Sequence, residues 1–142
     1  MTPRDRSPAS VARVDAKQAL AELVELSSQI RAAVVLGGDG AVLASTSDDA
    51  GTAEDLGRSA LELTEAAREL HAGGDNVTRV EVELEEGALF VVRSGGRTAA
   101  ATTGPQPTSG LVVYDLRTCL DRIEDEVKPK RRRRVATPKE SE

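Results

Sequence analysis

The sequence predicts a single α/β sandwich (α+β class) over about residues 13–127, in which helices cover a sheet of antiparallel strands. Short runs of β-branched and aliphatic residues are joined by glycine-rich turns, which suit antiparallel neighbours. Three longer segments repeat apolar residues at helical spacing. The elements run in the order α-β-β-α-β-β-β-α, and 142 residues suffice for one core.

The most informative stretch is a hairpin in the first third of the chain. Two apolar runs, Ala32–Leu36 and Ala41–Ser45, flank Gly37-Gly38-Asp39-Gly40. Glycine and aspartate adopt positive φ at low cost, so the tetrad predicts a tight turn. A strand rather than a helix follows it, and the glycines therefore do not hold a phosphate at a helix N-terminus.

Two helices are predicted around this hairpin. The first runs from about Arg13 to Gln29, and the second opens at Thr52-Ala53-Glu54-Asp55, which resembles a capping box. The second helix carries a regular seam at Leu56, Ala60, Leu63, Ala67 and Leu70, with large and small residues alternating. Such a narrow stripe permits close approach to another helix or to a sheet.

Three strands and a closing helix follow. In Val77–Leu84, valine and leucine alternate with charged residues, which is typical of a half-buried edge strand. Ala88–Arg93 is apolar on both faces and predicts an interior strand, and Thr98–Thr103 is a strand of small residues. The last helix is predicted over Leu111–Val127, with its seam at Val113, Leu116, Leu120, Ile123 and Val127.

Charge divides the chain into an acidic body and basic ends. Residues 11–127 carry 10 Lys+Arg against 21 Asp+Glu (−11), residues 128–142 carry 7 against 2 (+5), and residues 1–10 add +1, which totals −5. We predict disordered segments at 1–12 and 128–142. A single cysteine, short apolar runs and an N-terminal segment without a signal-peptide pattern favour a cytoplasmic protein without a transmembrane segment.

The sequence contains no pattern for catalysis, a cofactor or a metal site. His71 is the one histidine, and a cation at a helix C-terminus is its simplest interpretation. Cys119 flanks the last helix's seam and suits packing better than nucleophilic attack. No GxxxxGK[ST] motif is present, so the chain is not itself a P-loop GTPase. The basic run is the one strong anomaly, and it could contact a polyanion or partner through Lys128, Lys130, Arg131, Arg132, Arg133 and Arg134.

From Arg13 to Val127 the chain resembles the Roadblock/dynein light chain family, in its bacterial, small-GTPase-associated type. The resemblance lies in AAVVLGGDGAVLAS after the first helix, the Leu/Ala second helix, GALFVVRSGGRTAA and GLVVYDLRTCLDRI. It implies a profilin-like, five-stranded antiparallel sheet sandwiched by helices, and homodimers joined through the second helix and third strand. Members of the family do not catalyse reactions, and bacterial ones commonly act beside a small Ras-like GTPase.

Three functional classes follow. The first is a homodimeric regulator or adaptor of a small GTPase, with a dimer interface at Leu56, Ala60, Leu63, Ala67, Leu70, Val80 and Val82. The second is a small-ligand sensor or scaffold of the profilin/PAS-like type, which would need a cavity. The third is a polyanion-associated protein that acts through its basic tail, including on nucleic acid or an anionic surface. The acidic body argues against this class, because it would repel a polyanion.

Overall fold

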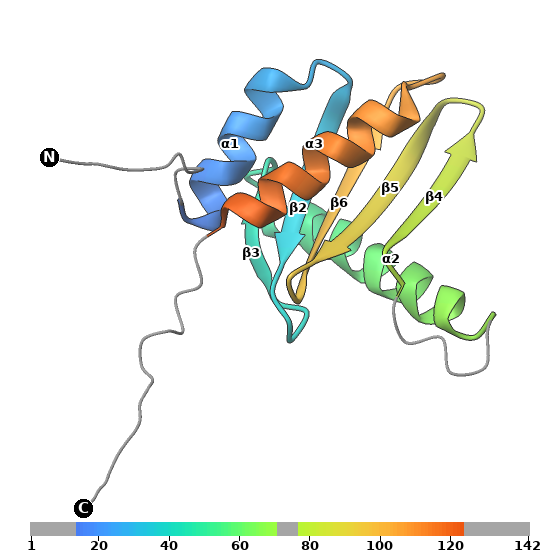
Figure 1. The fold of residues 1–142 in the computed structure, drawn as a ribbon, viewed down its shortest axis with the longest axis horizontal. Helices are drawn as coiled ribbons and strands as arrows, with labels where there is room; N and C mark the ends of the chain where they lie inside the picture. Colours follow the sequence, from blue (N-terminus) through green and yellow to red (C-terminus); the bar gives the residue numbers. More distant parts are fainter. Residues whose placement is uncertain (1–13, 71–76, 124–142) are drawn as a thin grey trace, which may run out of the picture.

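Helices cover both faces of one antiparallel sheet in the computed structural model, which describes residues 14–70 and 77–123 (Figure 1). The elements are α1 (Ala16–Leu26), β2 (Ile30–Leu36), β3 (Val42–Ser45), α2 (Ala50–Arg68), β4 (Arg79–Leu84), β5 (Gly87–Ser94), β6 (Arg97–Thr103) and α3 (Ser109–Arg122). Their order and types are those predicted. The fold class is therefore confirmed.

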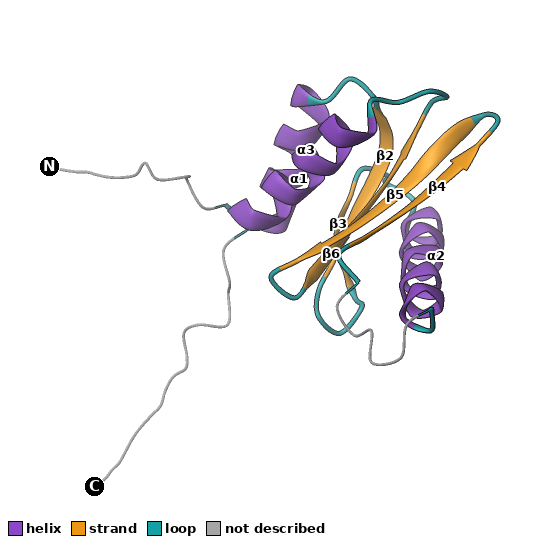
Figure 2. Ribbon diagram, turned by 45° about the vertical axis from the view of Figure 1, so that its right-hand side comes forward, coloured by secondary structure: helices purple, strands orange, loops and turns teal. Residues whose placement is uncertain are grey.

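The sheet order is β3-β2-β6-β5-β4, and every pair of neighbours is antiparallel. Figure 2 shows α1 and α3 side by side on one face and α2 alone on the other. The first and last helices of the domain therefore lie next to each other. Val14, before α1, forms a parallel bridge with Ile123, after α3. The charged alternation of β4 correctly predicted that this strand lies at an edge.

Two apolar layers hold the sandwich together. The larger layer lies beneath α1 and α3, where Phe90 and Leu116 are among the largest fully buried side chains. The smaller layer lies beneath α2 and contains Val34, Leu36 and Val91. The alanines of β6 alternate between the layers and are fully buried, so helices can approach the sheet closely from both sides.

The predicted hairpin turn is present, and a bulge follows it. Gly40 has a φ of +87° and its N–H donates to Gly37 O at 3.0 Å. Because Leu36 pairs with Val42 whereas Val35 pairs with Ala44, Leu43 is an extra residue without a partner on β2. The edge strand β3 is therefore both short and irregular.

The predicted start of the second helix was wrong. The helix begins at Ala50, and Asp49 is its N-cap, with a side chain that accepts from Gly51 N at 3.2 Å. Thr52, predicted to be the cap, instead donates its hydroxyl to the Asp49 carboxylate at 2.7 Å. The first helix is shorter than predicted at both ends, and α3 begins two residues earlier. The predicted tails, 1–12 and 128–142, lie outside the described residues, as do His71 and Val127.

Candidate functional site

Small residues set how α2 meets the sheet. Its buried residues are Ala53, Gly57, Ala60 and Thr64. A Cβ on Gly57 would lie 3.0 Å from the Leu36 side chain, so there is little room for anything larger. The Thr64 hydroxyl donates to Ala60 O at 2.9 Å, which satisfies this buried polar group within the helix. The centre of the helix face toward the sheet is thus lined by small side chains.

This packing corrects one residue of the predicted dimer stripe. Ala60 has no exposed surface in the single chain because it lies against the chain's own sheet, so it offers no contact to a partner. Leu56 and Leu63 are partly buried beside the smaller core layer, and Ala67 is also half-buried. Leu70 keeps 80% of its surface exposed. The stripe therefore runs along the shoulder of α2 that faces β4 and β5, and only Ala60 of its five residues lies at the helix's buried centre.

The face of β4 next to this shoulder is apolar and incompletely covered. Val80 packs with Leu56, Leu63 and Leu89 against the smaller layer, and Val82 is half-buried on the same side of the strand. Leu84 shares that side and is 63% exposed. The predicted alternation included Leu84, but the predicted dimer interface named only Val80 and Val82 from this strand. Among the described elements β4 has one neighbour, β5, so its outer edge is open.

The opposite side of β4 is charged. Arg79, Glu81 and Glu83 pair across the strands with Val92, Phe90 and Ala88, which belong to the layer beneath α1 and α3. All three charged side chains are exposed. The outer surface of α2 is also charged. It carries an exposed Arg58–Asp55 ion pair and an Arg68–Glu65 pair whose arginine is half-buried, and surface pairs of this kind contribute little to stability. The shoulder of α2 and the apolar side of β4 therefore form one strip between charged surfaces.

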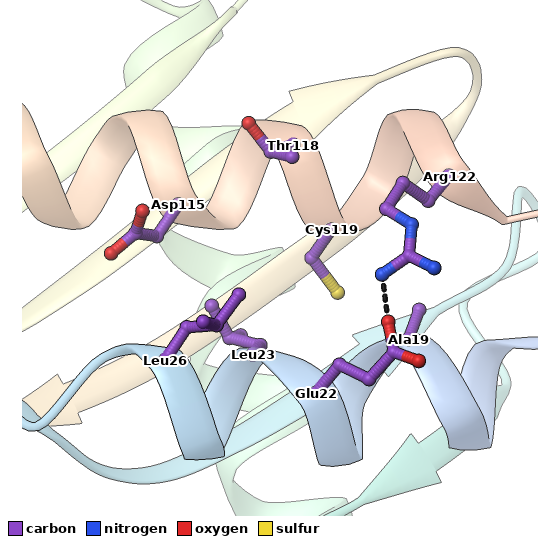
Figure 3. Close-up of a pocket in the computed structure, with 8 residues that line it drawn as sticks. All are labelled: Ala19, Glu22, Leu23, Leu26, Asp115, Thr118, Cys119 and Arg122. Carbon is purple, nitrogen blue, oxygen red and sulfur yellow. Dashed lines mark hydrogen bonds and ion pairs between the residues drawn. The ribbon is translucent and has the colours of Figure 1, made fainter. Parts of the chain in front are cut away.

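Figure 3 shows a second feature, a small apolar hollow between α1 and α3. Its volume is about 40 Å³, and an ion pair between Glu22 and Arg122 crosses it. Cys119 lies on its floor, and burial raises the pKa of the thiol to about 11. The thiolate is the reactive form, so this cysteine is a packing residue at neutral pH. The hollow is too small for a metabolite.

A polar depression of about 310 Å³ lies where α1 leads into β2 and β6 leads into α3. Arg31 crosses it so closely that a Cβ on Gly104 would be 2.8 Å from the guanidinium. Gln29 closes one side by accepting from Thr108 N at 2.6 Å. The depression is an open surface feature lined mainly by loop residues: Ser28, Gln29, Arg31, Thr103, Gly104, Pro105, Gln106 and Pro107.

The described residues contain no group of three or more His, Cys, Asp or Glu side chains placed to hold a metal ion. None of the helices over 14–70 and 77–123 is sufficiently long and apolar to cross a membrane. The six basic tail residues predicted to contact a polyanion lie outside the described residues, so the structure does not place them. The strip on α2 and β4 is therefore the candidate functional site.

Comparison with known proteins identifies a family and several solved structures that this chain resembles. The Roadblock/LC7 domain model matches residues 16–101. A Roadblock/LC7 domain from Streptomyces avermitilis is 24% identical with a TM-score of 0.66, covering 76% of this chain and 93% of that one. Myxococcus xanthus MglB is 12% identical (TM-score 0.59; 75% and 83% covered). Profilin II from Acanthamoeba castellanii is 11% identical (TM-score 0.52; 74% and 93% covered).

A search of curated proteins found no match. At these identities, the solved structures show only that the fold is shared. The family model covers more than half of the chain, from α1 into β6, and therefore shows the family. Among the described helices and strands, α3 is the one that lies wholly beyond the match, and it packs on the matched part through β5, β6 and α1. The chain belongs to the Roadblock/LC7 domain family.

Proposed function

We propose that this chain is a homodimeric, non-enzymatic regulator or adaptor of a small Ras-like GTPase. The family match over residues 16–101 carries the proposal. The resemblance implies such a partner for bacterial members, and a cytoplasmic location is part of the proposal. The chain itself supplies the reasons for expecting a dimer.

The dimer is supported by the strip on α2 and β4. Leu70 and Leu84 are large apolar side chains that water reaches, and Leu56, Leu63 and Val80 are only partly covered. Burial of such surface contributes about 25 cal/mol per Å², and an open strand edge offers backbone hydrogen bonds besides. A second copy would cover both features with the same two elements, as a two-fold interface requires.

A regulator needs no chemistry of its own. It shifts a GTPase between nucleotide states only through a difference in its affinity for them. Cys119 is protonated and buried, and the described residues place no metal cluster that could activate water.

The test is a binding experiment with a small Ras-like GTPase, chosen first from any that is encoded beside this chain's gene. Purified dimer is mixed with that GTPase loaded with a GTP analogue or with GDP, and capture is quantified for each. We expect stronger capture of one form, and unchanged GTP when this chain is incubated with nucleotide alone. Equal failure with both forms, together with direct binding of GTP or a metabolite by this chain, would favour the sensor alternative.

A further inference from the structure

A bulge at the start of β2 sets Arg31 apart from the rest of the strand. Ile30 pairs with Thr103 of β6 and Ala32 pairs with Thr102, so Arg31 is an extra residue without a partner on β6. Ile30 is buried in the layer beneath α1 and α3, whereas Arg31 is exposed. Bulges re-aim side chains and occur often beside functional sites. The bulge thus buries the isoleucine and leaves the arginine at the surface.

The Arg31 side chain lies in the polar depression between the α1–β2 and β6–α3 connections, whose volume is about 310 Å³. No hydrogen bond or ion pair joins its guanidinium to another described residue. A Cβ on Gly104 would lie 2.8 Å from the guanidinium, so the glycine leaves the space that this group occupies. The planar fork of N–H donors therefore remains available to a ligand.

The other polar side chains of the depression add donors without adding negative charge. Because Gln29 Oε1 accepts from Thr108 N at 2.6 Å, the amide nitrogen is the end of Gln29 that can donate to a ligand. Ser28 is exposed and contributes a hydroxyl. The lining residues include no Asp or Glu, although residues 11–127 carry 21 acidic side chains against 10 Lys+Arg. The depression is therefore a positive spot on an acidic domain.

The wall of the depression that leads into α3 has an unusual backbone. Gln106 has a φ of +59°, in the left-handed region that residues with a Cβ rarely adopt. It lies between Pro105 and Pro107, whose rings fix φ on both sides of it. A wall held in one conformation loses little freedom when a ligand binds, and affinity gains accordingly.

We propose that this depression binds the carboxylate of an acidic side chain on a protein partner. One guanidinium matches the single negative charge of a carboxylate, and its fork suits the two oxygens. A phosphorylated side chain carries about two negative charges and is usually held by a cluster of arginines, whereas Arg31 is the one charged residue in the lining. The proposal does not depend on the dimer or on the strip of α2 and β4.

The open shape of the depression favours a carboxylate carried by a polypeptide over a free small molecule. Sites for small molecules enclose most of the ligand surface, and this depression does not. A polypeptide gains further contacts around it. Leu26, at the end of α1, is 81% exposed, and Leu111, in the first turn of α3, is 51% exposed. Both leucines flank the connections that form the depression, so apolar residues beside the acidic one have surface to cover.

Peptide titration of the ¹⁵N-labelled full chain tests the site. The probes are capped pentapeptides with a central glutamate flanked by glycine, leucine or lysine, the same peptides with glutamine, acetate, and inorganic phosphate, all at equal ionic strength. We expect saturable shifts of the Gln29, Arg31 and Gly104 amide signals with at least one glutamate peptide. Its glutamine counterpart and acetate should each bind roughly tenfold more weakly, because one lacks the charge and the other lacks the flanking contacts.

Variants of the site separate its charge from its geometry. We expect Arg31→Gln to raise the dissociation constant of the glutamate peptide roughly tenfold, and Arg31→Lys to have a smaller effect since it keeps the charge but loses the fork. Gly104→Ala should also weaken binding, because the new Cβ displaces the guanidinium. Arg117→Gln removes the same charge from an exposed position on α3 and is the matched control. Circular dichroism checks that each variant is folded.

Several results would overturn the proposal. They are the absence of saturable shifts with every glutamate peptide, equal binding of the glutamate and glutamine peptides, and a dissociation constant that Arg31→Gln leaves unchanged. Acetate that binds as tightly as the peptides would assign the depression to free small carboxylates instead. Phosphate that binds more tightly than the peptides would assign it to phosphate groups.

Discussion

Two single residues at the starts of secondary-structure elements, Gly87 of β5 and Asp49 before α2, affect the stability of this domain. Gly87 begins β5 so close to the end of β6 that an added Cβ would lie 2.2 Å from Thr103 O. The backbone oxygen cannot move without disturbing the β5–β6 ladder, in which Ala88 pairs with Thr103. Glycine at this position is therefore required by space rather than by φ.

We expect Gly87→Ala to destabilise the domain by about 1–3 kcal/mol, the usual cost of forcing an extra carbon into a packed site. Gly110→Ala is the matched control, since a Cβ there has no heavy atom within 4 Å and the residue lies in a helix. Urea unfolding followed by circular dichroism measures both. Equal stability of the two variants would show that the β5–β6 contact yields at no cost.

Asp49 links the stability of α2 to pH. Hydrogen bonds from the Thr52 hydroxyl and Gly51 N–H hold the pKa of this carboxyl below its usual value. A lowered folded-state pKa stabilises the fold above the unfolded pKa, and the benefit is lost as the pH falls through the folded value. Asp49→Ala should therefore lower Tm at pH 7, and the difference from the natural chain should shrink below about pH 4.

Asp49→Asn separates the cap from the charge, because asparagine also accepts hydrogen bonds at an N-cap. We expect this variant to retain most of the Tm at pH 7 and to show a weaker acid dependence. A Tm difference between Asp49→Ala and the natural chain that stays constant from pH 7 to pH 3 would argue against the carboxylate as its source.

At the scale of elements, α2 presents two shoulders with different surroundings. Leu63 is partly buried against the smaller core layer, on which Val80 and Leu89 also pack, whereas Leu61 lies on the other side of the helix, next to the turn at Gly40. Both are leucines two residues apart on one helix, and Leu61 is 39% exposed. They form a matched pair for testing which side of the helix meets a second copy.

We expect Leu63→Arg to convert the dimer to monomer, because a charge would be buried without a partner in the proposed interface. Leu61→Arg should remain dimeric. Light scattering measures the mass, and circular dichroism checks that each variant is folded. A dimer of Leu63→Arg as stable as the natural one would remove this shoulder from the interface.

Most of these elements could be predicted from the sequence, because turns and apolar periodicity are local signals. The helix start could not, since Asp49 and Thr52 are both good caps and the bond between them decides which acts. The predicted stripe contained one residue of the buried face of α2, Ala60. Alanine, glycine and threonine carry little hydropathic signal, so Ala53, Gly57 and Thr64 were left out of the stripe. The openness of β4 depends on strand order, a tertiary property that charge alternation only indicated.

For the whole molecule, the separation of charge predicts how the chain meets polyanions. The acidic body should repel them, and a run of arginines without aromatic residues attracts them by neutralising phosphate or sulfate groups. We expect the full chain to be retained on heparin at low salt and released as salt rises. Removal of residues 128–142 should abolish retention, and unchanged retention would exclude the tail as its cause.

The bulge at Leu43 affects how copies of this chain could add to one another along the edges of the sheet. A protein whose sheet had two regular edges could add copies head to tail without end, because each addition would leave a fresh edge of the other kind. Here one edge is four residues long and interrupted by an extra residue, and such edges are poor templates for pairing. Addition through β4 consumes the regular edge and leaves an irregular one at each end. The bulge thus favours an assembly that closes over one that becomes a fibre.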